Sequence, residues 1–138
     1  MPTPEDLEEG QTITYQRTFT REDVQTFAAL SGDQGYHHLV SEGEGPAMVH
    51  GLLTATLPTK IGGDINYVAR TMHFEFPRPV YTGETITCEV TLEHLSGEAT
   101  LEHLSESDDG RELEASWVCT NEEDGVVLRG SSEGILYG

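Results

Sequence analysis

Residues 47–63 read AMVHGLLTATLPTKIGG, and this stretch decides the fold. Lys60 is its only acidic or basic residue apart from a histidine, so the segment is predicted to be a buried helix. Pro46 opens the helix and Gly62-Gly63 ends it. Pro58 predicts a kink or an early end, because proline has no backbone N–H to donate.

Strand patterns flank this helix on both sides. Toward the C-terminus, strands are predicted over 66–76, 84–95, 111–121 and 125–136, separated by turns rich in Gly, Pro, Asp and Asn. Toward the N-terminus, a strand is predicted over 11–19, followed by a helix from the N-cap Thr20 to Ser31-Gly32. This order indicates an α+β fold, in which one curved antiparallel sheet wraps around a central buried helix. Residues 1–138 are predicted to form this single domain, with 1–10 as a flexible arm.

The charge balance excludes several classes of function. Asp and Glu number 25 against 7 Lys and Arg, which gives a formal net charge of -18. A nucleic-acid-binding face and an anionic membrane surface both call for basic residues, so neither partner is expected. No apolar run reaches the roughly 20 residues of a spanning helix. The acidic N-terminus has no secretory signal pattern, so we expect a cytoplasmic protein.

An acid-rich, lysine-poor surface is typical of proteins from salt-accumulating halophiles, although an acidic mesophilic protein is the alternative. The halophile interpretation predicts a melting temperature that rises between about 0.01 and about 1 M KCl. Over that range the screening length falls from roughly 30 Å to about 3 Å, which weakens the repulsion among surface carboxylates. Melting curves by circular dichroism would check this, and a flat or falling melting temperature would remove the interpretation.

The sequence contains a pair of cysteines and a pair of histidines, but their spacing does not favour a metal-binding site. Cys88 and Cys119 lie in separate strand patterns and are expected to be buried free thiols, with a disulfide left open. A short repeat, TLEHLS, begins at Thr91 and again at Thr100, which indicates a lengthened hairpin or a small duplication. Its histidines, His94 and His103, lack a third ligand at matching spacing, so solvated strand positions are favoured over metal binding.

The stretch with the chemistry is FAALSGDQGYHH, residues 27–38, followed by MVHG at 48–51. An acid and a histidine on one loop, Asp33 and His38, can transfer protons when a substrate lies within hydrogen-bond reach. The first turn of the buried helix contains Gly51, and free N–H groups at a helix start can stabilise an oxyanion. From spacing alone, a turn aspartate and a surface histidine are the favoured interpretation.

A resemblance to a known family favours the catalytic interpretation of Asp33 and His38 instead. FAALSGDxxxxH, then VHG, then FEFPRPVYTGETI from Phe74 are similar to the signature segments of the MaoC-like dehydratases, the (R)-specific enoyl-CoA hydratases. The similarity runs from about Thr18 to the C-terminus. It implies the hotdog fold, a long central helix wrapped by a curved antiparallel sheet. It also implies a homodimer or a dimer-based oligomer with the sites at the interface.

The resemblance also implies residue roles. Asp33 and His38 match the signature acid and histidine and would hold the water that adds to a trans-2-enoyl-CoA, giving an (R)-3-hydroxyacyl-CoA. Gly51 matches the glycine whose N–H binds the thioester oxygen, and Thr59 falls where some members have an active-site serine. No metal and no redox cofactor is implied, and the acyl-CoA is the substrate. Both polyester precursor supply and fatty-acid metabolism are compatible with this activity.

Three positions depart from the family pattern. Gly35-Tyr36 replaces Asn-Pro, Val40 replaces a frequent Asp, and the segment 39–45 is short. Glycine, like asparagine, adopts a left-handed backbone, so the loop is expected to keep its shape. The shortened segment leaves acyl chain length undefined.

For the other histidines in these segments and for three cationic residues, non-catalytic interpretations are favoured. His37 is interpreted as loop surface, and His50 as a packing or capping residue. Arg70, Arg78 and Lys60 could meet the phosphates of CoA, although unspecialised surface charges are favoured for all three. Two other functions remain open: a hotdog thioesterase, and a non-catalytic acyl-CoA-binding subunit.

Overall fold

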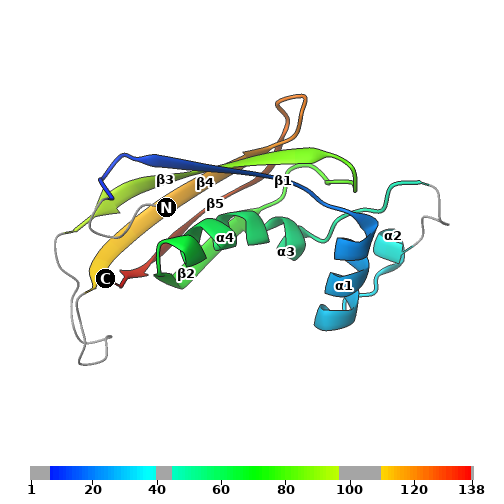
Figure 1. Ribbon diagram of the computed structural model, residues 1–138, viewed down its shortest axis with the longest axis horizontal. Helices are drawn as coiled ribbons and strands as arrows, with labels where there is room; N and C mark the ends of the chain where they lie inside the picture. Colours follow the sequence, from blue (N-terminus) through cyan, green and yellow to red (C-terminus); the bar gives the residue numbers. More distant parts are fainter. Residues whose placement is uncertain (1–6, 40–44, 97–109, 138) are drawn as a thin grey trace.

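The computed structural model describes residues 7–39, 45–96 and 110–137, and its central helix lies against one face of a sheet (Figure 1). In chain order the elements are β1 (Thr12–Thr18), α1 (Arg21–Ser31), α2 (Tyr36–Leu39), α3 (Gly51–Thr54), α4 (Thr56–Asp64), β2 (Tyr67–Glu75), β3 (Thr85–Leu95), β4 (Arg111–Thr120) and β5 (Val126–Leu136).

A single antiparallel sheet has the strand order β1-β3-β4-β5-β2. It curves over α4, whereas α1 and α2 stand beyond one end of the sheet (Figure 1). The four strands predicted after the helix and the one before it all form close to their expected bounds. The predicted α+β fold is therefore confirmed, and the sheet with its enclosed helix is the hotdog architecture.

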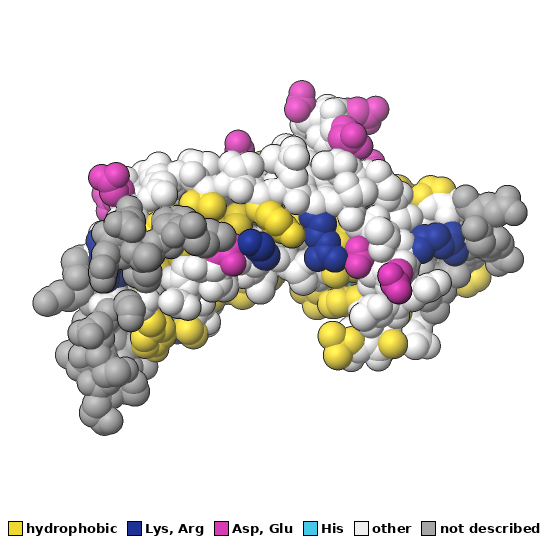
Figure 2. Space-filling view, in the orientation of Figure 1, with side chains coloured by type: hydrophobic (Ala, Val, Ile, Leu, Met, Phe, Trp, Pro, Cys, Tyr) yellow, Lys and Arg dark blue, Asp and Glu magenta, His cyan; other side chains and the backbone are white. Residues whose placement is uncertain are grey.

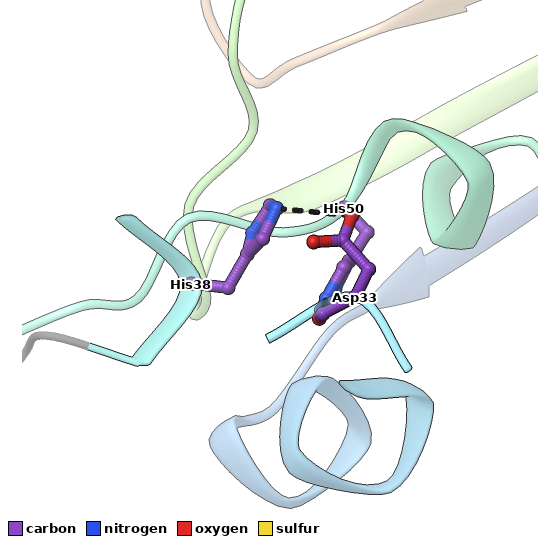
Figure 3. A group of neighbouring side chains, drawn as sticks. All are labelled: Asp33, His38 and His50. Carbon is purple, nitrogen blue, oxygen red and sulfur yellow. Dashed lines mark hydrogen bonds and ion pairs between the residues drawn. The ribbon is translucent and has the colours of Figure 1, made fainter. Parts of the chain in front are cut away.

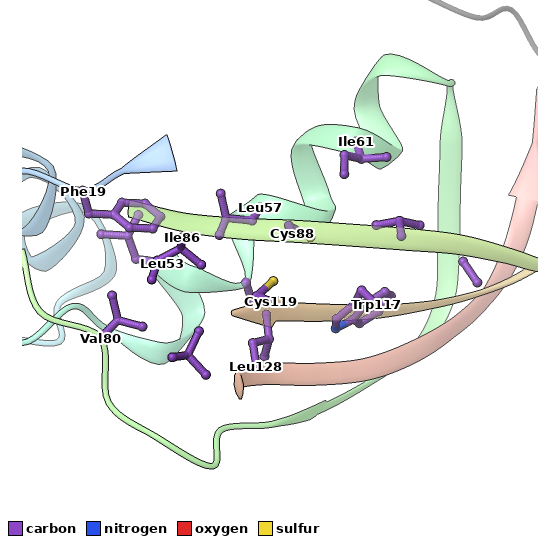
Figure 4. Close-up of a cluster of buried hydrophobic side chains, with 14 of the residues drawn as sticks. Phe19, Leu53, Leu57, Ile61, Val80, Ile86, Cys88, Trp117, Cys119 and Leu128 are labelled. Atoms are coloured by element: carbon purple, nitrogen blue, oxygen red, sulfur yellow. The ribbon is translucent and has the colours of Figure 1, made fainter. Parts of the chain in front are cut away.

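The core lies between α4 and the middle of the sheet. Leu57 and Ile61 project from α4 toward the side chains of β3 and β4, among them Cys88, Cys119 and Trp117 (Figure 4). The two cysteines are directly opposite in the β3–β4 register and are buried free thiols, as expected from the sequence. The hydrogen bond between them, together with burial, raises the pKa of the Cys119 thiol.

Helix α1 begins and ends as its sequence predicts. The Thr20 hydroxyl accepts from the Asp23 N–H at 3.1 Å, and the Asp23 carboxylate accepts from the Thr20 N–H at 2.9 Å, which forms a capping box. The hydrogen bond from the Thr20 backbone is the main cause of a lowered pKa for Asp23. Gly32 ends the helix at φ 81° and sends the chain into the loop that follows.

The buried helix starts later than predicted. Instead of opening a helix at Pro46, the chain stays extended to His50, because Val49 donates to the Val80 carbonyl at 2.8 Å and Met48 bridges to Tyr81. Helix α3 then begins at Gly51. Pairing with Val80 and Tyr81, which lie much further along the chain, competes with helix formation here. No local sequence pattern predicts that pairing.

Pro58 produces the predicted interruption in a particular form. Helices α3 and α4 are separated at Ala55, and Pro58 lies in the first turn of α4. The first turn tolerates proline, because its N–H groups have no partner within the helix. The chain therefore restarts the helix just ahead of the proline.

Residues at the N-terminus of the described part belong to the body of the protein. Leu7 is buried in the core, and the Gly10 N–H donates to the Leu92 carbonyl, so the predicted arm does not extend to these positions. Residues 1–6 and the second TLEHLS copy, with His103, lie outside the described residues. His94 is exposed on β3. Among the described helices, none is long and apolar enough to cross a membrane.

Candidate active site

Asp33 lies in the loop between α1 and α2, directly after the left-handed Gly32. Its side chain is 56% exposed, and its Oδ1 accepts from the Gly35 N–H at 3.2 Å. Its own N–H donates to Ser31 Oγ at 3.0 Å. These local bonds fix the turn while leaving Oδ2 of the carboxylate available.

The expected left-handed backbone at Gly35 is wrong. Among the described residues, Gly35 is not one of those with positive φ. A Cβ at this position would lie 2.9 Å from the His37 ring and 3.3 Å from Asp33 Oδ1. A larger residue here would have to displace the exposed His37 ring or the Asp33 carboxylate, so the space at Gly35 is limited by two side chains, and its left-handed freedom is not used.

His38 is the buried member of the pair and is held in one tautomer. The side chain is 5% exposed, and Nδ1 lies 2.8 Å from the Met48 carbonyl oxygen, so Nδ1 must carry the hydrogen. In the neutral ring Nε2 is then an acceptor, and it lies 3.8 Å from Asp33 Oδ2 (Figure 3). Two acceptors at this separation repel as a direct pair but can share one water molecule that donates to both.

His50 links the two residues in a way that sequence spacing did not predict. Its side chain is 1% exposed, and Nε2 donates to the Asp33 carbonyl oxygen at 2.9 Å. Its ring stacks on His38 with centroids 3.6 Å apart and planes at 15°, while Phe27 packs 4.8 Å away. His50 is the N-cap residue of α3, but its side chain makes no capping hydrogen bond and packs on the neighbouring rings instead.

The ligand atoms of Asp33, His38 and His50 lie within 4.8 Å of one another, which raises the question of a metal ion. Zinc would sit roughly 2.0–2.1 Å from each nitrogen, in the plane of each ring. Two rings stacked at 15° have nearly parallel planes, so their lone pairs do not converge on one point. In addition, His38 Nδ1 and His50 Nε2 are both engaged by carbonyl oxygens. The donor set favours stacking and hydrogen bonding over chelation.

A cavity of about 460 Å³ opens beside His38. It is lined by His37, His38, Met48, Val49, Gly51, Thr54, Phe76, Arg78, Pro79, Val80 and Val127. Aliphatic and aromatic side chains make up most of the wall, with the imidazoles, Arg78 and the Thr54 hydroxyl as its charged or polar groups. Such a wall suits a largely apolar ligand that carries a few polar atoms.

Gly51 contributes backbone to this cavity. It is the first residue of α3, and no hydrogen bond between described residues uses its N–H. The half-exposed Phe76 ring lies so close that a Cβ at Gly51 would be 2.9 Å from it. Only glycine at this position allows the aromatic ring to cover the backbone at the helix start.

The structure does not bring Thr59 to the other predicted site residues. Thr59 is exposed, its hydroxyl donates to the Ala55 carbonyl at 2.9 Å, and it does not line the cavity. Thr54, one turn earlier, lines it instead. His37 is exposed as expected, but its ring lies 3.8 Å from that of His38 and it also lines the cavity.

Fold and site together define a hotdog protein in which the His38 imidazole lies 3.8 Å from the Asp33 carboxylate and lines a largely apolar cavity. An (R)-specific enoyl-CoA hydratase from Rhodospirillum rubrum is 33% identical over 103 residues, which cover 66% of this chain and 69% of that protein. The chain therefore belongs to the (R)-specific enoyl-CoA hydratase family. No protein-family model matches it.

Solved structures agree on the fold. The (R)-hydratase from A. caviae involved in PHA biosynthesis has a TM-score of 0.77 and 23% identity, covering 96% of this chain and 99% of that one. An unliganded R-hydratase from Pseudomonas aeruginosa has a TM-score of 0.75 and 21% identity, covering 96% and 83%. At these identities the likeness concerns the arrangement of helices and strands.

Proposed function

We propose that this protein catalyses the reversible hydration of trans-2-enoyl-CoA to (R)-3-hydroxyacyl-CoA in the cytoplasm. The observation that carries the proposal is the hydrogen bond from His38 Nδ1 to the Met48 carbonyl, which turns Nε2 toward the Asp33 carboxylate at 3.8 Å. A water molecule that donates one hydrogen to each of these two acceptors keeps its oxygen lone pairs free for attack. The relative from Rhodospirillum rubrum, named as an (R)-specific enoyl-CoA hydratase, supports the same activity.

In the proposed mechanism Asp33 accepts one proton from the water as its oxygen bonds to C3 of the enoyl group. The C2–C3 π electrons move toward the thioester, whose carbonyl oxygen gains negative charge. His38 Nε2 orients the water. The proton held by Asp33 then passes through Nε2 to C2 as the enolate collapses, so both residues return to their starting protonation states. Hydroxide and proton are both supplied by one water molecule, so the reaction has no net redox change and requires no redox cofactor.

The N–H of Gly51 is the proposed donor to the developing oxyanion. It lines the same cavity as His38 and has no other partner among the described residues. A donor that is already oriented stabilises charge without reorganising during the reaction. The apolar surroundings, with Phe76 over the glycine, strengthen such a hydrogen bond.

The direct test is hydration of crotonyl-CoA by the purified protein at high salt, followed as loss of enoyl absorbance, with release of free thiol measured in parallel. Loss of absorbance without thiol release is the expected result. Thiol release would instead make the protein a thioesterase. If crotonyl-CoA binds but neither loss of absorbance nor thiol release is seen, the protein is a non-catalytic acyl-CoA-binding subunit.

We also propose that the protein is a homodimer or a dimer-based oligomer. Edge strand β2 exposes Val68 by 53% and Met72 by 47%, and an apolar strand edge is stabilised by pairing with a second copy. Light scattering in molar KCl should give twice the chain mass or a multiple of it. A monomer with full hydratase activity would contradict a site that needs two chains.

A further inference from the structure

Seven cationic side chains serve a protein of net charge -18, and their partners differ. Four form ion pairs: Arg17 with Asp23, Lys60 with Asp64, Arg70 with Glu112, and Arg129 with Glu75. Arg21 and Arg111 donate to the carbonyls of Gly45 and Ser96 and have further partners. Figure 2 shows Lys and Arg in a few separated patches on the face drawn. One cation remains after these six.

Arg78 is that cation. None of the ion pairs between described residues includes it, and its Nη1 donates to the Val126 carbonyl oxygen at 3.2 Å. Its stem packs on the β4–β5 hairpin, where a Cβ added to Gly125 would lie 3.2 Å from Arg78 Cδ. The guanidinium is thus anchored by one of its five N–H groups, and the others are not used by any described residue.

Arg78 lines the same cavity as His38 and the Gly51 N–H. Arg70, the other arginine at a described cavity, faces Glu112, Glu114 and Glu133 there and is paired with the first of them. Phosphate would be repelled at Arg70. At Arg78 it would meet an unpaired guanidinium, which suits phosphate oxygens in two-point contact.

We propose that Arg78 binds a phosphate of the phosphopantetheine thioester that carries the acyl group. This inference rests on the proposed function, since it takes the reacting end of the ligand to lie at His38 and Gly51. CoA is strongly anionic and meets a chain of net charge -18, so one cation in the cavity wall counts for more than it would on a neutral protein. Glu122, Glu123 and Asp124 in the adjoining hairpin weaken phosphate binding in all variants alike.

The test compares Arg78→Gln and Arg78→Lys with Arg129→Gln on three thioesters: crotonyl-CoA, crotonyl-4′-phosphopantetheine and crotonyl-pantetheine. Arg129→Gln removes the same charge from an exposed pair with Glu75 outside the cavity, so it controls for net charge. Assays use the lowest KCl concentration at which circular dichroism shows the native fold, because salt screens the contact.

For Arg78→Gln the expected result is a roughly tenfold fall in kcat/KM with crotonyl-CoA, carried by KM, since hydrogen bonds between charged groups contribute about that factor at exposed sites. Arg78→Lys should recover part of the loss, and Arg129→Gln should match the wild type. The loss should vanish with crotonyl-pantetheine. A loss that persists with crotonyl-4′-phosphopantetheine assigns the contact to the phosphate shared by CoA and carrier proteins, as proposed. A loss confined to crotonyl-CoA would overturn that assignment and place the contact at the nucleotide phosphates.

An equal loss on all three thioesters, or no loss on any, would overturn the role of Arg78 while leaving the hydratase activity of the wild type in place. Absence of hydration by the wild-type protein on every thioester would instead overturn the proposed function. The two failures are therefore distinguishable within one set of assays.

Discussion

Asp33→Asn is expected to lower kcat for crotonyl-CoA hydration by about 10²–10⁴-fold, the usual contribution of a positioned acid or base. Asparagine keeps the shape of the side chain and an oxygen that can accept from the Gly35 N–H. It cannot take a proton from water, so the attacking hydroxide is not formed. Because the side chain is 56% exposed and turned toward His38, the substitution should cost little stability.

A matched control is Glu89→Gln, which removes one negative charge from an exposed position on β3. Circular dichroism and melting temperature of both variants would establish that they are folded, and initial rates at saturating substrate give kcat. If Asp33→Asn retains wild-type kcat while folded, Asp33 is a turn residue and the base is elsewhere.

Most of the fold could be predicted from local patterns. The period-two alternation of the β3 residues and the capping residues Thr20 and Asp23 are properties of neighbouring positions, and both formed as expected. Such patterns depend on interactions among a few neighbouring residues, so the elements they predict depend little on contacts with distant segments. This is why the elements lie close to their predicted bounds.

The features that could not be predicted are contacts between distant segments. The start of α3 depends on the pairing of Val49 with Val80, and the cover over Gly51 is the ring of Phe76. The hydrogen bond from His50 to the Asp33 carbonyl joins two segments 17 residues apart. None of these follows from spacing, because each is decided by how the helices pack under the sheet.

The residues of the candidate site likewise divide into those that a local motif predicts and those that depend on how the chain folds. Asp33, His38 and Gly51 were identified from their motif, and the structure brings the two side chains within 3.8 Å and places His38 and Gly51 on one cavity. Thr59 was assigned by counting along a helix assumed to be continuous. The break at Ala55 and the internal hydrogen bond of its hydroxyl leave Thr59 outside the cavity lining.

The adjacent histidines provide the second large prediction. His38→Ala is expected to lower kcat by about 10²–10⁴-fold, because it removes the Nε2 acceptor that orients the water and handles the proton. His37→Ala should remain within roughly threefold of wild type, as expected for a residue without a transition-state contact. The contrast is demanding, since both rings line one cavity and their centroids are 3.8 Å apart. The two histidines differ in how firmly their rings are held. His38 is buried and hydrogen-bonded to the Met48 carbonyl, whereas His37 is exposed.

Removal of His38 also leaves the Met48 carbonyl without its donor, so a fall in kcat has to be separated from loss of structure. Steady-state hydration of crotonyl-CoA by both variants, with circular dichroism spectra and melting curves recorded under the same salt conditions, makes that separation. A folded His38→Ala with KM near the wild-type value and a depressed kcat supports a role in the transition state. An inactive His37→Ala beside an active His38→Ala would reverse the assignment of the two histidines. Full activity in both variants would mean that neither imidazole is required by itself, and the proposed role of His38 in orienting the water would be wrong.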